Sequence, residues 1–319
     1  MHTRRRRGRL THYVPGGTVP PVSGIAVIAN PAAGHGRARH LIRPLRQAFA
    51  DSGASVALTN GPGHEATLTR AAIAAGAHTI VVAGGDGTWN RCVSAALDAD
   101  ADRVRFAFVS AGTGNDFAKH LGAPSRDLPA MAALAANRAA ERRVDVGAVE
   151  SGGQRMWFLN VAGFGFDAAV LEDLAGRGGR GGAASYVATA LRRLLTYPGF
   201  AFTEGGSQGR SHLAMMLVFS NGASFGGVFR IAPAARVDDG ALDQVMIGDV
   251  QGLARLPLFV RALRGVHLNH PKVRAVRRTG FDLTFSAPPM CDLDGELVRL
   301  ASRDVAVRAL PGALRVAAP

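Results

Sequence analysis

The stretch at residues 81–90 constrains the fold most, because an apolar run leads there into Gly-Gly-Asp-Gly and then into a helix-forming segment. Glycines allow positive φ angles and let backbone N–H groups approach a phosphate, and a helix N-terminus adds partial positive charge. Asp86 would repel a phosphate unless a divalent cation lay between them, so its presence favours a metal ion. Taken alone, the stretch also suits an ordinary tight strand-to-helix turn.

Two further turns of this kind follow apolar runs in the same half of the chain. Asn-Pro-Ala-Ala-Gly-His-Gly occupies residues 30–36, and Gly-Thr-Gly-Asn-Asp-Phe-Ala occupies residues 112–118. Loops at the carboxyl ends of parallel strands line one crevice, so we expect the three turns to converge on one ligand. The chain has no G-x-x-x-x-G-K-[ST] motif and its only lysines are Lys119 and Lys272, which disfavours a P-loop NTPase or a protein kinase.

Apolar runs of strand length alternate with amphipathic segments of helix length over the first half of the chain. This alternation predicts a parallel sheet covered by helices, an α/β domain. The predicted strands are 25–29, 56–59, 79–83 and 104–110, and the predicted helices are 37–52, 64–75 and 88–97.

After about residue 142 the pattern changes to short apolar runs between Gly, Pro and Asp turns, which predicts a mostly β domain. The predicted strands are 144–149, 156–161, 213–219, 228–232, 242–247, 273–277, 281–285 and 305–310, with helices at 183–196 and 253–263 and glycine-rich loops at 176–182 and 205–209. The 319 residues exceed the usual size of one domain. We divide them into a flexible basic leader at 1–22, an α/β domain at 23–142 completed by 308–319, and a β domain at 143–307.

Arginine dominates the formal net charge of +13, partly through a basic arm at residues 4–9 and through Arg37, Arg39, Arg43 and Arg46 on one predicted helix. Such a charge suits nucleic acid, anionic lipid headgroups or nucleotide phosphates, and it also suits a solvated helix face with a tail. Aromatic residues make up only 6% of the chain and do not interleave with basic ones, so we expect no nucleic-acid partner.

No stretch of about 20 apolar residues is present, and the arginines at 4–7 are not followed by the apolar segment of a secretory signal. We therefore expect a cytoplasmic protein without a membrane-spanning helix. Cys92 and Cys291 are too few for a disulfide framework or a four-cysteine zinc site, and we expect both to pack in the core.

Four motifs occur together: N-P-x-A-G-x-G at 30–36, G-G-D-G-T-x-N at 84–90, G-T-G-N-D-F-A at 112–118 and D-G-E at 294–296. This set resembles the diacylglycerol kinase catalytic-domain family, which includes bacterial lipid kinases and sphingosine kinases, over about residues 24–319. G-G-D-G-T alone is shared with NAD kinases, whereas the first and third motifs are similar to the lipid-kinase branch. The resemblance implies a Rossmann-like N-terminal domain, as in NAD kinases and diacylglycerol kinases, a C-terminal β-sandwich for the lipid, and ATP between them.

The resemblance also implies which residues bind ATP. They are Asn30, Pro31, Gly34, Gly36, Thr59, Gly84, Gly85, Asp86, Gly87, Thr88, Asn90, Gly112, Thr113 and Asn115. Thr59 is included only because it ends the second predicted strand. The chain departs from the family pattern at Arg91, where the family commonly has Glu, so a charge near the nucleotide is reversed.

By the same resemblance, Glu296 is the general base that takes the proton from the acceptor hydroxyl, and Asp294 supports it. Taken alone, the D-G-E motif also suits an ordinary hairpin turn.

The resemblance further implies Mg²⁺, bound through Asp86, Asp116 and Asp145 in a network that links the two domains. A second, structural Mg²⁺ is implied at the Asp239 carboxylate with the carbonyls of Arg236 and Ala241. Hard oxygen ligands suit this ion, although the segment 236–241 alone also suits a β-turn.

We therefore expect an ATP- and Mg²⁺-dependent lipid kinase that phosphorylates a primary hydroxyl, most simply that of diacylglycerol, at the inner face of a membrane. The arginine-rich leader and other basic patches would attract anionic lipid. A soluble NAD-kinase-like enzyme and a catalytically silent nucleotide or lipid sensor are alternatives. The sequence specifies neither the acyl chains and headgroup of the acceptor nor whether the chain forms a homodimer.

Overall fold

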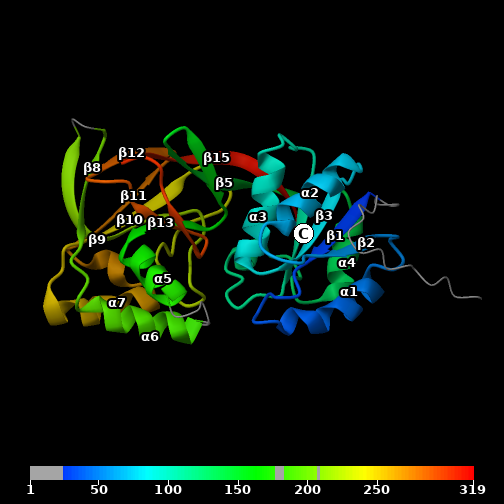
Figure 1. The fold of residues 1–319 in the computed structure, drawn as a ribbon, viewed down its shortest axis with the longest axis horizontal. Helices are drawn as coiled ribbons and strands as arrows, with labels where there is room; N and C mark the ends of the chain where they lie inside the picture. The colour runs from blue at the N-terminus through cyan, green and yellow to red at the C-terminus, as the bar shows by residue number, and fades with distance from the viewer. Residues whose placement is uncertain (1–23, 177–182, 207–208) are drawn as a thin grey trace, which may run out of the picture.

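The computed structural model describes residues 24–176, 183–206 and 209–319. The predicted leader and parts of the two predicted glycine-rich loops lie outside these ranges. The described residues fold into an N-terminal α/β half and a C-terminal half dominated by antiparallel strands, which confirms the predicted fold class (Figure 1). No helix in these ranges is long and apolar enough to cross a membrane.

The N-terminal half is built on parallel strands in the order β4-β3-β1-β2, covered by helices on both faces (Figure 1). The strands are β1 (Ile25–Ala29), β2 (Ser55–Leu58), β3 (Thr79–Gly84) and β4 (Arg105–Ser110). The helices are α1 (Ile42–Ala48), α2 (His64–Ala74), α3 (Asp86–Leu97) and α4 (Leu128–Ala136), with short 3₁₀ turns at Arg37–Leu41 and Phe117–His120.

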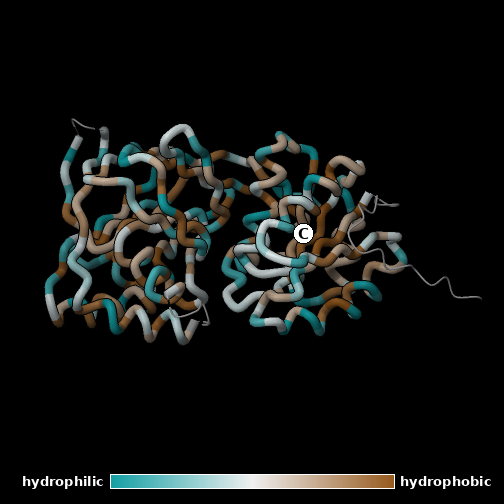
Figure 2. The backbone as a smooth tube through the Cα atoms, viewed as in Figure 1, coloured by the Kyte–Doolittle hydropathy of each residue, from teal (hydrophilic) through white to brown (hydrophobic). Residues whose placement is uncertain are grey.

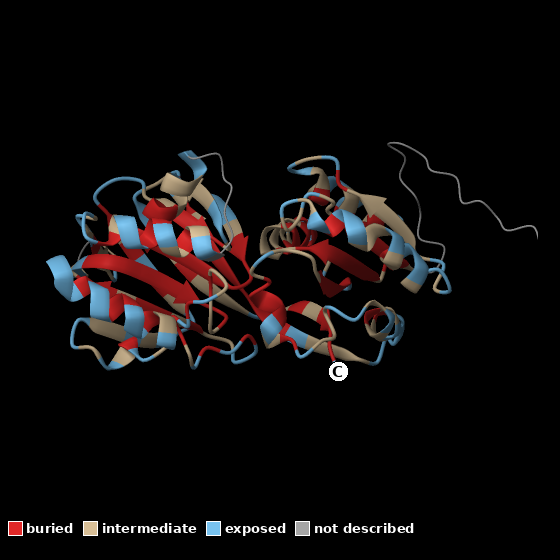
Figure 3. Ribbon diagram, turned by 90° about the horizontal axis from the view of Figure 1, so that it is seen from below, coloured by how far each residue is buried: buried red, intermediate tan, exposed pale blue. Residues whose placement is uncertain are grey.

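Successive side chains of β3 enter two different cores, because strand side chains alternate between the faces of a sheet. Ile80 and Val82 pack with the core beneath α2 and α3, whereas Val81 and Ala83 pack with the core beneath α1 and α4. The apolar colour of the central strands in Figure 2 and their burial in Figure 3 follow from this coverage on both faces.

The C-terminal half contains two further apolar cores, one between its strands and one beneath its helices. Its strands are β5 (Glu141–Ser151), β6 (Gln154–Phe158), β7 (Val161–Gly165), β8 (Phe200–Glu204), β9 (Arg210–Ser220), β10 (Leu242–Gly248), β11 (Val273–Arg278), β12 (Gly280–Phe285), β13 (Met290–Leu293), β14 (Glu296–Arg299) and β15 (Asp304–Ala317). Its helices are α5 (Phe166–Gly176), α6 (Ala183–Leu194) and α7 (Arg255–Arg264), with short 3₁₀ turns at Gly252–Ala254 and His267–Asn269.

Strand β15 joins the two halves. Its first part pairs with β12 and β5, and its last part adds Arg315 and Val316 to β4 in parallel register. The register shifts between Leu310 and Leu314, where Gly312 has a φ of +58°. This irregularity turns the strand from the C-terminal sheet into the α/β sheet (Figure 1).

Some predicted elements differ from the structure. The predicted strand at 228–232 is wrong, since these residues form turns held by a single bridge between Phe225 and Phe229. The predicted strand at 156–161 is two strands, β6 and β7. The strand is interrupted between them because the backbone N–H groups of residues 159–161 donate to the Asp294 carboxylate instead of to a neighbouring strand. Helices α4 and α5 were not predicted, because their apolar residues are not confined to one helix face.

Candidate active site

The three glycine-bearing turns meet at the carboxyl ends of β1, β3 and β4. A Cβ atom on Gly85 would lie 3.0 Å from the Cα of Gly112, and one on Gly34 would lie 2.6 Å from the carbonyl oxygen of Ala111. The N–H groups of Ala111 and Gly112 donate to the carbonyl oxygen of Gly84, at 2.8 and 3.1 Å. The backbones are so close that only glycine fits at these positions, and the predicted convergence is present.

Polar side chains complete this convergence. The Asn30 amide donates to the Thr88 hydroxyl at 2.9 Å and so joins the first turn to the start of α3. Asn115, with a φ of +49°, exchanges hydrogen bonds with both backbone groups of Gly112 and closes the third turn on itself. Thr59 is buried at the end of β2, where its N–H donates to Ala29.

Helix α3 begins at Asp86, two residues earlier than predicted. Its N-terminus therefore lies directly between the glycine turns. The free N–H groups and partial positive charge of that N-terminus face the region where the three loops meet, an arrangement that suits a phosphate group.

Asp86, which is partly buried, and Asp116, which is buried, form a pair of acids beside this N-terminus. A Cβ atom on Gly114 would lie 3.2 Å from an oxygen of each carboxylate. The N–H of Phe117 donates to Asp86 at 3.1 Å, and Gly227 donates to Asp116 at 2.9 Å from the C-terminal half. Burial, and then the charge of Asp116, raises the pKa of Asp86 from 3.8 to about 6.

Glu296 begins β14 and lies against the first turn of α3. A Cβ atom on Gly87 would lie 2.8 Å from the Glu296 Oε1 atom. The side chain is half-exposed, and its Oε1 atom accepts a hydrogen bond from Arg91 at 2.7 Å. The last residue of the D-G-E motif thus reaches the glycine turns, although more than 200 residues separate them in sequence.

Asp294 occupies the turn between β13 and β14 with a φ of +52°. Its buried carboxylate accepts hydrogen bonds from the Asn90 amide and from the backbone N–H groups of Leu159, Asn160 and Val161. Burial raises the pKa of Asp294, and these donors oppose the increase. The D-G-E segment is therefore both a hairpin turn, as its residues alone suggested, and the anchor that holds Glu296 beside α3.

Arg91 and Glu65 belong to the same site, and sequence reasoning did not assign them. Arg91 lies between two carboxylates, with nitrogen atoms 2.7 Å from Glu296 and 3.4 Å from Glu65. The side chain of Glu65 is only 2% exposed. The reversed charge at Arg91 was visible in the sequence, but no pattern there indicated either acid as its partner.

Asp145 lies apart from the acid pair. Its two carboxylate oxygens accept the N–H groups of Gly240 and Gly312, each at 2.7 Å. Among the described residues, no group of three or more His, Cys, Asp or Glu side chains is placed to hold a metal ion. The structure thus brings Asp86 and Asp116 together but does not bring Asp145 to them.

The second predicted metal site, at 236–241, is a turn in which Asp239 already has partners. Its carboxylate lies 3.1 Å from Arg277 and accepts the N–H of Ala241 at 3.2 Å. The side chain of Arg236 contacts Asp238, at 3.3 Å. The segment is a turn, and metal binding at the Asp239 carboxylate with the carbonyls of Arg236 and Ala241 stays a prediction.

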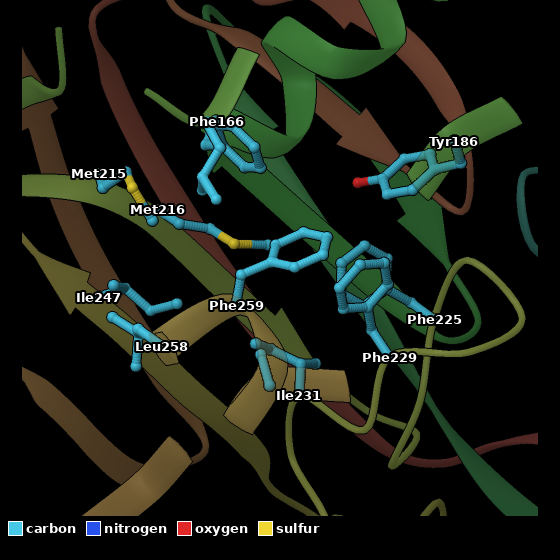
Figure 4. A pocket seen from close by; sticks show the side chains of 12 residues that line it. Phe166, Tyr186, Met215, Met216, Phe225, Phe229, Ile231, Ile247, Leu258 and Phe259 are labelled. Carbon is cyan, nitrogen blue, oxygen red and sulfur yellow. The ribbon is translucent and has the colours of Figure 1, made fainter. Parts of the chain in front are cut away.

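A cavity of about 220 Å³ opens beside the acid pair. Its polar end is formed by Asp86, Asp116, Asp294 and residues of the third glycine turn, and its apolar end by Leu171, Leu174, Tyr186 and Phe225, with Asp292 beside Tyr186. Tyr186 and Phe225 also line a second, apolar cavity of about 30 Å³ beneath α6 and α7, which Figure 4 shows from close by. Polar and apolar space therefore adjoin at these two residues.

Sequence reasoning also missed a buried polar cluster at this junction. The Tyr186 hydroxyl donates to Asp167, which is hydrogen-bonded to Asp292. Burial, and then the charge of Asp167, raises the pKa of Asp292 well above its usual range. The three residues lie on separate elements, and nothing in their spacing links them.

Comparison with known proteins agrees with this geometry. Residues 24–149 match the family described as "Diacylglycerol kinase catalytic domain", and residues 160–318 match "YegS C-terminal NAD kinase beta sandwich-like domain". The chain is 34% identical to a "Probable lipid kinase YegS-like" of Pseudomonas fluorescens, over 83% of this chain and 85% of that protein. It is 28% identical to a "Diacylglycerol kinase" of Mycobacterium tuberculosis, over 92% and 95% of the two chains.

Among solved structures, a diacylglycerol kinase from Bacillus anthracis shares the fold, with a TM-score of 0.67 and 22% identity. The match covers 93% of this chain and 97% of that one. Both halves, including the strand that joins them, therefore belong to one shared architecture.

Proposed function

This chain belongs to the diacylglycerol kinase catalytic-domain family and is a lipid kinase with ATP as phosphoryl donor, and we propose that its acceptor is the primary hydroxyl of diacylglycerol. The product would be phosphatidic acid. The observation that carries the proposal is the position of Glu296 against Gly87 in the first turn of α3. The residues that precede these two in the chain, Gly295 and Asp86, line the 220 Å³ cavity.

In the proposed reaction, Glu296 takes the proton of the lipid hydroxyl while the hydroxyl oxygen attacks the γ-phosphorus of ATP. A new P–O bond forms to the lipid, the bond between the γ-phosphorus and the β,γ-bridging oxygen breaks, and ADP leaves. Asp294 only positions the turn that carries Glu296, since its carboxylate oxygens accept hydrogen bonds from Asn90 and from the backbone of residues 159–161.

The shape of the cavity supports an amphiphilic acceptor. A lipid hydroxyl would lie at the polar end, near the acid pair, and the acyl chains would extend past Tyr186 and Phe225 toward the apolar cavity. A soluble nucleotide acceptor, as in NAD kinases, would leave this apolar end without a partner. The cavity thus favours the lipid over the nucleotide ribose.

Mg²⁺ is the cation that we propose for the acid pair. The Asp86 and Asp116 carboxylates line the cavity and are hard oxygen ligands of the kind that this ion prefers. Bound there, the ion would offset the charge of the nucleotide phosphates and relieve the repulsion between the two acids. We leave Asp145 out of this set, because it lies at Gly240 and Gly312 rather than beside Asp86 and Asp116.

Radiolabelled ATP supplied with a panel of lipids in neutral detergent micelles, with the products separated by chromatography, tests the proposal. We expect label in phosphatidic acid and a loss of rate of about 10²–10⁴-fold in Glu296→Gln.

Glu150→Gln is the matched control for that variant, because Glu150 also forms a partly exposed ion pair with an arginine, Arg155, at 2.7 Å. Its rate should equal that of the wild type. No labelled lipid from the wild type, or equal rates in wild type and Glu296→Gln, would contradict the proposal.

A further inference from the structure

Exposed apolar side chains gather on two helices of the C-terminal half. Leu191 and Leu195, at the end of α6, are 43% and 45% exposed. Leu253, Leu256 and Val260, at the start of α7 and along it, are 71%, 38% and 45% exposed. We call these five residues the docking face. Most of the large apolar side chains that are exposed within the described ranges lie on it, and such a concentration marks a binding surface.

The two helices present this face as one unit. The buried guanidinium of Arg255, in the first turn of α7, donates to the carbonyl oxygens of Leu194 and Tyr197 at the end of α6, at 2.7 and 2.8 Å. The end of α6 and the start of α7 are therefore held together, and Figure 1 shows both helices along the same lower edge of the C-terminal half.

The two segments that carry the docking face contribute charge of one sign. Residues 183–196 and 252–266 contain five arginines and no Asp or Glu. Arg192, Arg261 and Arg264 are exposed, whereas Arg193 pairs with Asp173 of α5 at 3.2 Å. Apolar side chains flanked by exposed arginines are typical of helices that lie in the interface of an anionic bilayer.

The opposite faces of the same helices line the apolar cavity. Tyr186 of α6, and Leu258 and Phe259 of α7, point into it (Figure 4), and Leu194 of α6 also lines it. One helix layer thus separates the docking face from the space in which the proposed function places acyl chains.

We propose that the docking face binds the surface of an anionic phospholipid bilayer, with its leucines among the headgroups and its arginines against lipid phosphates. The proposal rests on the proposed lipid acceptor and adds the face through which the enzyme meets the membrane. A second copy of the chain fits this face less well, because self-association would bring arginines against arginines with no acid between them.

Co-sedimentation with vesicles of phosphatidylcholine and phosphatidylglycerol, without ATP or diacylglycerol, tests the face directly. We expect Arg261→Gln to weaken binding about fivefold, and Arg192→Gln to do the same, because each basic residue near such a surface contributes about 1 kcal/mol. Leu253→Gln combined with Leu256→Gln should weaken binding more than about tenfold. Arg70→Gln is the matched control, since Arg70 is exposed on α2, at the opposite edge of the molecule in Figure 1, and should bind as the wild type does.

The same variants are then assayed with diacylglycerol in neutral detergent micelles, where no bilayer is present. Wild-type rates there, with weakened vesicle binding, support the docking face. The proposal is overturned if the wild type does not bind the vesicles, or if the arginine and leucine variants bind them as the wild type does. It is also overturned, in favour of a second copy, if the wild type does not bind vesicles but forms a dimer and these variants are monomeric. Vesicle binding without any lipid phosphorylation would refute the proposed acceptor and leave the docking face standing.

Discussion

At the scale of single residues, Arg91 decides how Glu296 is held. It contacts the proposed base on one side and the buried Glu65 on the other. Arg91 therefore has two roles that the structure separates. It positions the exposed carboxylate that we propose as the base, and it compensates the buried carboxylate of Glu65.

Arg91→Met tests these two roles. We expect a fall in kcat of about tenfold or more, because Glu296 loses its positioning contact. We also expect a loss of stability of about 1–3 kcal/mol, because the buried Glu65 loses its partner. Adding Glu65→Gln should restore stability, measured by urea unfolding, without restoring kcat. If the double variant regained the full rate, Arg91 would have only a structural role.

Also at the scale of single residues, Asp86 makes the stability of the protein depend on pH. Its pKa is raised from 3.8 to about 6 in the folded protein, so between these values the native state binds this proton more tightly than the unfolded chain does. Stability from this group is therefore lost as the pH rises through that window. Asp86→Asn should be more stable than the wild type at neutral pH, by up to about 3 kcal/mol, and equal to it near pH 4.

Urea unfolding in metal-free buffer at both pH values measures this difference. The Asn side chain can still accept the N–H of Phe117, so the comparison isolates the charge. Equal stabilities at neutral pH would show that the Asp86 carboxylate is not destabilised by burial.

At the scale of elements, the important feature is that the turns after β1, β3 and β4 lie in backbone contact. Sequence periodicity placed these strands within a residue or so and indicated the order of strand, glycine turn and helix. It did so because buried parallel strands consist of short, nearly continuous apolar runs. The split between β6 and β7 could not be predicted, since its cause is a carboxylate 133 to 135 residues further along the chain.

Gly112→Ala tests whether the closeness of the turns serves ATP binding. The added Cβ atom would lie 2.5 Å from the Cα of Gly85, so the two turns must move apart. We expect ATP binding, measured by calorimetry, to weaken about tenfold or more, because the phosphate contacts lose their geometry. Gly61→Ala is the control, because nothing lies within 4 Å of its added Cβ atom. Equal ATP affinities in both variants would contradict this role for the turns.

At the scale of the whole molecule, β15 and Asp145 hold the two halves in one structure. β15 runs from the C-terminal sheet into the α/β sheet, and Asp145 binds the backbone at Gly312, where the strand turns. The other carboxylate oxygen binds Gly240, which belongs to the predicted second metal site. This carboxylate therefore supports the junction between the halves.

Asp145→Ala should lower stability by about 2 kcal/mol or more even in metal-free buffer, because two backbone N–H groups lose their acceptor. Asp304→Ala, which removes an exposed hydrogen bond to Thr284, should cost less than about 0.5 kcal/mol. Urea unfolding with chelator present measures both. If Asp145→Ala were less stable than the wild type only in buffer that contains Mg²⁺, and equally stable with chelator, a metal-binding role would be favoured instead.

The sequence by itself determined the two kinds of domain, the strands beneath the glycine turns and the glycine turns themselves, because period-two and helical patterns and backbone-dependent glycines are local properties. Only the tertiary structure decided which charges meet: Arg91 with Glu296 and Glu65, and Asp145 with the junction rather than with Asp86. It alone assembled the docking face from α6 and α7. Pairing of charges and exposure of leucines depend on which elements pack together, and that packing is a property of the whole folded chain.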